Sequence, residues 1–524
     1  MFKYIKNDLP ASIVVFFVAL PLCLGIALAS GAPLFSGLIA GIIGGIVVGA
    51  LSGSQIGVSG PAAGLAAIVL TAIGALGGYQ NFLLAVVLGG AIQLAFGILK
   101  AGIIGYYFPS SVIKGMLTGI GIIIILKQIP HFFGYNPESN FVFFETDGQN
   151  TFSEIFQTVN NISPGATLVA VIGLAILLLW DKVLAKKGKI FQLVQGPLVA
   201  VAVGIIFYVL TMDSETISIS SDHLVSVPIP EDATSFLAQF SFPNFGAISN
   251  PQIWITAFTI ALVASLETLL CVEATDKLDP YKNVTPTNRE LLAQGTGNIL
   301  SGMVGGLPIT QVIVRSSANI QSGGRSKMSA IIHGFFLLIS VILIPRLLNM
   351  IPLSVLAAIL LIVGYKLAKP ALFKKMYQLG WKQFIPFTVT VLGIVFTDLL
   401  VGIGLGLAVG VVVILIKSYQ NSHFLHIEDK SNGIHKIKMT LAEEVTFFNK
   451  GAILKELDSI PKDSYLELDV RNTRYLDNDI IEILEDFSGK AKNRNIDIKL
   501  ISERGITENP DSYIEFFKLR PKSA

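Results

Sequence analysis

Long apolar runs fill the first four-fifths of the chain, and charges or Gly/Pro breaks separate them. An apolar helix of about 20 residues crosses a bilayer, so each run is a candidate membrane span. Two runs, 290–303 and 308–318, are too short to span unaided. The pattern predicts a multi-span α-helical membrane protein with fourteen spans, near residues 10–30, 34–52, 57–76, 82–103, 110–127, 166–180, 194–212, 253–272, 290–303, 308–318, 329–348, 352–367, 383–398 and 400–417.

The pattern changes after Lys417, and 36 of the chain's 74 charged residues lie from Lys417 to Ala524. Strands alternate with helices in this part, which predicts a small α/β domain. We therefore expect a transmembrane domain at 1–420 and a soluble domain at 424–524. The elements predicted for the soluble domain are strands at 434–440, 464–470 and 496–501 and helices at 450–459 and 478–492.

The loops between spans sort by charge. The loops 181–192 and 366–382 carry nine lysines, whereas 128–165 and 213–252 contain no Lys or Arg and several Asp and Glu. Positively charged loops stay cytoplasmic. This bias places both termini in the cytoplasm of a multi-pass protein of the inner (plasma) membrane, which agrees with an even number of spans.

Seven spans, a polar loop and seven further spans suggest two repeats, at about 8–212 and 252–418. Because each repeat has an odd number of spans, the second is inverted in the membrane, as in many secondary transporters. Each half also holds a short segment broken by Gly and Pro, around Gly60-Pro61 and around Pro308. Proline is favoured in the first turn of a helix, so each segment predicts a helix that begins at mid-membrane.

Two such helix starts would face each other and expose unpaired N–H groups with roughly half a positive charge each. They would form a pocket suited to a small anion. The small residues Ala62, Ala63 and Gly64 would let a ligand approach the backbone. The alternative is that both Gly-Pro pairs are simple kinks, which membrane helices tolerate. Pro21 breaks the first span in the same way, so Leu22 and Ile26 either line the pocket or flank a kink.

Glu267 lies deep in the apolar run that opens the second half. A carboxylate costs a few kcal/mol at that depth, so its presence suggests a function. Binding H⁺ or Na⁺ together with the substrate would give it one, and Cys271 lies on the same helix face. The alternative is a structural ion pair with Arg315. Arg315 could instead attract the anion over a distance, or extend to the cytoplasmic surface.

Several other functions lack support in the sequence. The six histidines are scattered and the two cysteines lie in apolar runs, so we expect no metal site, disulfide framework or other cofactor. Motifs for nucleotide binding or for a nucleophile are missing, and Glu267 stands nearly alone as an ionisable group, so an enzyme is not expected. The net charge of +2 suggests no nucleic-acid partner. Without an ATP-binding module, uphill transport would need an ion gradient.

The chain resembles the SulP (sulfate permease) family of anion permeases over almost its whole length. The matching motifs are Leu20-Pro21 with 27–31, Gly60-Pro61, and Pro308 through Ser329. The tail resembles a STAS (sulfate transporter and anti-sigma antagonist) domain through 446–449 and 466–470. The departures are apolar residues at 312–314, where relatives often carry hydroxyls, and Asp477-Asn478 where phosphorylatable relatives carry Asp-Ser or Asp-Thr.

The resemblance implies a core and a gate domain that move in an elevator-like manner, usually in a homodimer. It implies anion binding between the third and tenth spans, near Ala62, Ala63, Gly64, Gln311, Val312 and Ile313. It also implies that Glu267 stands where relatives carry an acidic residue tied to cation coupling.

We therefore expect a secondary active transporter of a small inorganic anion, with bicarbonate first and sulfate second, coupled to Na⁺ or H⁺. The alternatives are an uncoupled channel or exchanger, a dicarboxylate transporter of the same fold, a nucleobase permease with a related repeat, and an anion sensor that signals through its tail.

Overall fold

A computed structural model describes residues 2–103, 109–135, 157–158, 160–188, 191, 194–229, 239–397, 399–431, 434–503, 505–510 and 512–518. The chain divides into two compact units, Met1–Leu407 and Ala408–Ala524. The domain borders expected from the sequence, at 420 and 424, stay a prediction.

Each of the fourteen predicted spans corresponds to helical structure in the described residues. Eight helices or helical segments are long and apolar enough to cross a membrane, and four more are apolar but shorter. The helices of the first half are α1 (Ile5–Ala29), α2 (Leu34–Ile43), which continues through a π-helical turn (Gly44–Val48) into α3 (Gly49–Leu51), α4 (Ala63–Ala75), α5 (Tyr79–Ile98), α7 (Ser110–Phe132), α9 (Pro164–Lys182) and α11 (Gly196–Thr211).

The second half repeats this order in the described residues. Its helices are α13 (Pro251–Leu278), α14 (Thr287–Met303), α15 (Ile313–Gln321), α16 (Met328–Leu343), the short α17 (Pro345–Leu348), α18 (Leu353–Leu367), α19 (Pro370–Gln378), α20 (Trp381–Phe396) and α21 (Leu399–Gln420). Helices α14 and α15 are the two segments that are too short to span unaided. They are extensively buried, which explains how such helices are accommodated.

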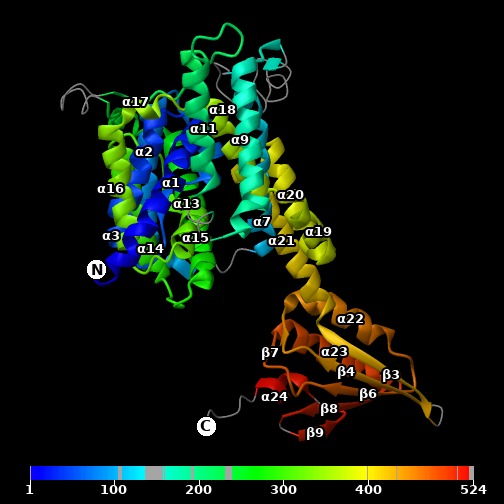
Figure 1. Cartoon of the computed structure of the whole chain (residues 1–524). Coiled ribbons are helices and arrows are strands. Elements are labelled where there is room, and N and C mark those ends of the chain that lie inside the picture. Colours follow the sequence, from blue (N-terminus) through cyan, green and yellow to red (C-terminus); the bar gives the residue numbers. More distant parts are fainter. Residues whose placement is uncertain are drawn as a thin grey trace. The chain divides into compact units, whose positions relative to one another are not determined.

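The two halves interlock in two helix groups. In the first group α1 packs on α2, α15 and α16, and α5 packs on α13 and α14. Figure 1 shows the blue helices α1 and α2 among the green helices α13 to α16. In the second group α7 packs on α18 and α20, and α9 packs on α11 and α18. Each group takes equivalent helices from both halves, so the fold is two inverted seven-span repeats arranged as a core and a gate.

Glycines allow close packing between the halves. A Cβ on Gly90 of α5 would lie 2.7 Å from the backbone N of Ile299 on α14, and one on Gly295 would lie 2.8 Å from the carbonyl O of Gly90. Small residues let membrane helices approach backbone to backbone. The glycine content of the sequence therefore serves the contact between α5 and α14.

The C-terminal unit is an α/β fold around its own apolar core. Its five-stranded sheet has the order β3-β4-β6-β8-β9, in which β4, β6 and β8 are parallel. The predicted elements all appear, and the pattern missed β3, β5, β7, β9 and α24. The bounds are β3 (His423–Ser431), β4 (Ile434–Leu441), β5 (Glu444–Val445), α22 (Lys450–Ser459), β6 (Ser464–Asp469), β7 (Tyr475–Leu476), α23 (Asn478–Asn493), β8 (Asp497–Ser502), β9 (Gly505–Glu508) and α24 (Tyr513–Lys518).

Candidate functional site

A two-stranded ribbon joins the halves at the broken segments. Strand β1 (Ser59–Pro61) pairs antiparallel with β2 (Ile309–Gln311), with Ser59 opposite Gln311 and Pro61 opposite Ile309. The backbone N of Val312 also donates to the carbonyl O of Val58 at 2.9 Å. Helices α4 and α15 begin directly after the two strands, at the extended residues Ala62 and Val312.

This ribbon orients the two helix starts. Because the strands are antiparallel, α4 and α15 leave the ribbon in opposite directions and turn their N-terminal ends towards it. Val58 pairs with Val312, and Ala62 lies four residues further along the strand of Val58. At the usual rise per strand residue, the two helix starts are therefore about 13 Å apart. Neither start has a side-chain cap. The positive ends of two helix dipoles therefore flank the ribbon.

The predicted anion-site residues divide between these starts. Ala62, Ala63 and Gly64 form the start of α4, and Val312 and Ile313 that of α15. Gln311 ends β2, is 1% exposed, and donates from Nε2 to Oγ1 of Thr275 at 3.2 Å. Its Oε1 has no hydrogen-bond partner among the described residues.

Glu267 extends from α13 to the start of α4. A Cβ on Gly64 would lie 2.5 Å from Oε1 and 2.6 Å from Oε2 of this carboxylate, so the carboxylate rests directly on the glycine backbone. The backbone N–H of Gly64 is within hydrogen-bonding reach of it. Oε2 is buried and has no hydrogen-bond partner among the described residues. An acidic group with one unsatisfied oxygen therefore sits at the positive end of a helix.

The next turn of α13 contacts the second broken segment. Oγ1 of Thr268 accepts from the backbone N of Gln311 at 3.3 Å. The thiol of Cys271, one turn after Glu267 on the same helix, lies beside the backbone N–H of Ile313. Helix α13 thus contacts the starts of both α4 and α15, so a change of charge at Glu267 acts close to each start.

Arg315 lies behind the ribbon. It is 0% exposed, and its Nη2 donates to Sγ of Cys23 on α1 at 3.3 Å. Its guanidinium rests on Gly60, because a Cβ there would collide with Nη1. The described residues contain no ion pair between Arg315 and Glu267, and burial excludes an extension to the cytoplasmic surface. Of the interpretations open from the sequence, the ion pair and the extension to the surface do not fit this placement, and an electrostatic role near the expected anion site stays a prediction.

Leu22 and Ile26 are buried in the apolar core on α1. This helix packs against α4, α15 and β1 and stays continuous through Pro21. Both side chains therefore belong to the helix that packs beside the two helix starts, and their part in lining the site stays a prediction.

A frame of buried amides holds the ribbon, and the sequence analysis missed it. Asn298 of α14 accepts from the backbone N of Ile309 at 2.5 Å and donates to its carbonyl O at 3.1 Å. It also donates to Gln93 of α5 at 2.6 Å. Gln294 donates to Oγ of Ser59 at 2.8 Å and to the buried carboxylate of Glu290 at 2.9 Å. Polar residues within the predicted span 290–303 were the available signal.

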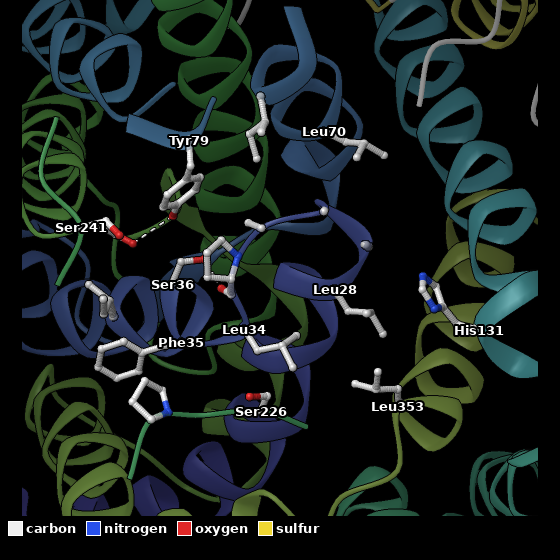
Figure 2. Close-up of a pocket in the computed structure, with 18 of the residues that line it drawn as sticks. Leu28, Leu34, Phe35, Ser36, Leu70, Tyr79, His131, Ser226, Ser241 and Leu353 are labelled. Atoms are coloured by element: carbon white, nitrogen blue, oxygen red, sulfur yellow. Dashed lines mark hydrogen bonds between the residues drawn. The ribbon is translucent and has the colours of Figure 1, made fainter. Parts of the chain in front are cut away.

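A cavity of about 720 Å³ lies at the opposite end of α4. Leu28 from α1 and Leu70 from α4 line it, as do His131 of α7 and Leu353 of α18. Figure 2 shows Leu28 facing His131 and Leu353 across this space. None of the predicted site residues lines the cavity, which lies between core and gate helices about 10 residues of α4 away from Gly64. It has the position of a vestibule.

The donor chemistry offers no metal centre. Among the described residues, no three His, Cys, Asp or Glu side chains gather closely enough to hold a metal ion.

Comparisons with known proteins agree on one family. A family model described as the sulfate permease family matches residues 5–390. YvdB of Bacillus subtilis (strain 168) is 28% identical over 501 residues, which cover 94% of this chain and 90% of that protein. The bicarbonate transporter BicA of Picosynechococcus sp. (strain PCC 7002) is 26% identical over 452 residues, covering 84% and 76%.

The solved structure of SLC26A9 has the same fold. It superposes with a TM-score of 0.75 at 17% identity, covering 95% of this chain and 85% of that one. This coverage includes the C-terminal unit, whose α/β fold is consistent with a STAS-like domain. The match over residues 5–390, together with the inverted repeat and the facing helix starts, decides the assignment. The chain is a multi-pass membrane protein of the sulfate permease family, whose members transport anions and are not enzymes.

Proposed function

We propose that the chain is a secondary active transporter that moves a small inorganic anion, bicarbonate before sulfate, together with a cation through Glu267. The observation that carries this proposal is the contact of the Glu267 carboxylate with Gly64, at the start of the helix that forms half of the anion site.

The anion would bind between the starts of α4 and α15. N–H groups of the first turn and the helix dipoles attract negative charge. The side chains there are those of Ala62, Ala63, Val312 and Ile313, so backbone groups would supply most of the contacts. Arg315 would add positive charge from behind Gly60 without touching the anion. Such a site suits a small anion, and BicA, which shares 26% identity, is named a bicarbonate transporter.

Electrostatics couple the two binding events. An ionised Glu267 at the start of α4 competes with the anion for the same positive helix end, and a proton or cation on the carboxylate removes that competition. Among the described residues, this carboxylate lies against the backbone of Gly64, whose N–H is within hydrogen-bonding reach, and Cys271 follows one turn later on the same helix. Hard cations prefer oxygen ligands, and an N–H group repels a cation. H⁺ therefore fits this site better than Na⁺.

The core and gate groups supply the moving parts. In an elevator-like cycle, the core helices that carry both helix starts would slide past the gate helices and expose the site to each side in turn. We further propose cytoplasmic termini, from the lysine-rich loops, and a homodimer as the working assembly. The C-terminal unit is proposed to be a STAS domain with a regulatory or assembly role.

Uptake into proteoliposomes tests the function. Labelled bicarbonate and sulfate would be offered separately, under an imposed H⁺ gradient or an imposed Na⁺ gradient. We expect accumulation of bicarbonate that follows the H⁺ gradient. Accumulation driven only by Na⁺ would refute the proton assignment, and uptake of neither anion would favour a dicarboxylate or a sensor.

Glu267→Gln tests the coupling residue. The amide keeps the shape but carries no titratable proton, so we expect anion exchange to persist while gradient-driven accumulation is lost. Glu273→Gln serves as the matched control, since Glu273 lies further along α13 and is exposed. Undiminished gradient-driven accumulation by Glu267→Gln would exclude Glu267 as the coupling residue.

A further inference from the structure

Two buried polar side chains behind the ribbon have complementary atoms without partners. Arg315 on α15 and His333 on α16 are both 0% exposed. Within the described part of the chain, Nε and Nη1 of Arg315 and Nε2 of His333 find no hydrogen-bond partner. Buried polar groups in native proteins are nearly always satisfied by protein or ordered water, so these three atoms require an explanation.

The tautomer of His333 follows from its other nitrogen. Nδ1 lies 2.5 Å from the carbonyl O of Ala330, one turn earlier in α16. A carbonyl oxygen only accepts, so Nδ1 carries the hydrogen and Nε2 of the neutral ring is an acceptor. The unsatisfied atoms of Arg315 are N–H donors. One side thus offers donors and the other an acceptor.

Two glycines of the π-helical turn bring the two groups into one neighbourhood. Gly44 abuts Gly60, on which the Arg315 guanidinium rests, and a Cβ on Gly45 would lie 2.8 Å from Cε1 of His333. Gly44 and Gly45 are consecutive residues, so the Arg315 guanidinium and the His333 ring flank the same turn of backbone. π-helical turns occur frequently at functional sites, where they alter local packing.

We propose that a small cluster of ordered water links Arg315 to His333, and that His333 is a positioning residue that fixes the guanidinium behind Gly60. A water molecule accepts from Nε or Nη1 of Arg315 and donates to Nε2 of His333, which supplies the partners that a buried water needs. Together with Sγ of Cys23, the water holds the charge where it supports the anion.

This inference rests on the proposed electrostatic role of Arg315 in anion binding. It adds that His333, a residue on a different helix with no contact to the anion, sets the apparent anion affinity through Arg315. His333→Leu removes the acceptor and releases the guanidinium. His333→Gln keeps an acceptor oxygen at the end of a side chain of similar length.

A double-mutant cycle on the full-length, detergent-purified protein tests the link. The readout is thermal stabilisation by added bicarbonate, sulfate and chloride, which yields an apparent Kd without requiring transport. We expect His333→Leu to weaken binding roughly three- to tenfold, the range of one hydrogen bond. His333→Gln should restore most of it, and His333→Leu should have no effect on Kd in the Arg315→Gln background.

Ser340→Ala is the matched control, because Ser340 is buried on the same helix and its hydroxyl bonds, among the described residues, to the carbonyl O of Leu337 on that helix. An equal loss of affinity from His333→Leu in both backgrounds would show a merely structural role and overturn the proposal. If Arg315→Gln alone leaves binding unchanged, the proposed role of Arg315 fails instead. An experimental density map that resolves ordered water tests the cluster itself. A map without water between the two side chains would refute the cluster.

Discussion

At the scale of single residues, two glycines leave the space in which the charged groups of Glu267 and Arg315 lie. Gly64 and Gly60 each hold an ionisable group against the backbone, Glu267 on one and Arg315 on the other. Neither position has a positive φ, so the requirement is space rather than conformation. The two groups lie on different glycines of the same broken segment and form no ion pair within the described residues. The proposed binding of a cation at one group and of an anion near the other requires this separation.

Gly64→Ala should disrupt this arrangement. The new methyl group would lie 2.5 Å from Oε1 of Glu267 and force the carboxylate away, at a cost of about 1–3 kcal/mol for overpacking. If all of this cost falls on the transport cycle, kcat/KM for anion uptake drops about five- to 150-fold. Uptake kinetics in proteoliposomes would measure the loss.

Two further variants test whether the contact between Gly64 and Glu267 causes this loss of uptake. Gly404→Ala is the control, because Gly404 is also helical and a Cβ there meets nothing within 4 Å. The double variant Gly64→Ala/Glu267→Asp shortens the carboxylate and should recover part of the uptake. Full activity of Gly64→Ala would contradict the close contact on which the coupling proposal depends.

At the scale of elements, the hydrophobic pattern predicted the helices but missed the elements that form by pairing with a distant segment. The fourteen apolar runs became helices, and the prolines at 61 and 308 marked the two broken segments. The ribbon itself was not foreseen, because three-residue strands have no hydrophobic period and pair only in the folded chain. Whether the residues grouped there bind an anion stays a prediction.

The polar frame shows why partners were harder to predict. Glu290 stands at the edge of an apolar run, so it was interpreted as a span boundary, but it is 0% exposed and accepts from Ser52 at 2.5 Å. Arg315 had three candidate roles from the sequence. Only its contacts with Cys23 and Gly60, which lie about 290 and 255 residues away, distinguish among them. Pairings at such separations leave no local pattern.

Asn298→Ala tests the frame as an element. The side chain of Asn298 satisfies both the N–H and the C=O of Ile309 in β2, so its loss leaves buried backbone groups unpaired at about 1–3 kcal/mol each. We expect a lower melting temperature in detergent and a raised KM for the anion. Thr296→Ala, on the same helix, removes a hydroxyl that bonds only to Leu292 and should change neither. An unaltered KM for Asn298→Ala would show that the ribbon does not position the anion site.

At the scale of the whole molecule, the proposed binding site and the C-terminal tail belong to different compact units. Every residue assigned here to anion or cation binding lies in the unit Met1–Leu407, which has its own apolar core. The unit Ala408–Ala524 has a second core formed by its sheet and helices. Units with separate cores can in principle fold independently, so transport and the function of the tail should be separable.

Removal of 424–524 puts this separation to the test. A transporter whose site lies wholly in the first unit should keep gradient-driven anion uptake, with a KM within about twofold of the full chain, less than 0.5 kcal/mol in binding. The maximal rate is allowed to fall, because the tail is proposed to regulate or assemble the protein. Uptake per inserted protein in proteoliposomes, normalised by the amount that survives size-exclusion chromatography, would give both quantities. A truncated protein that elutes as a folded species, still binds the anion and yet moves none would contradict this separation and would mean that the tail takes part in the transport cycle.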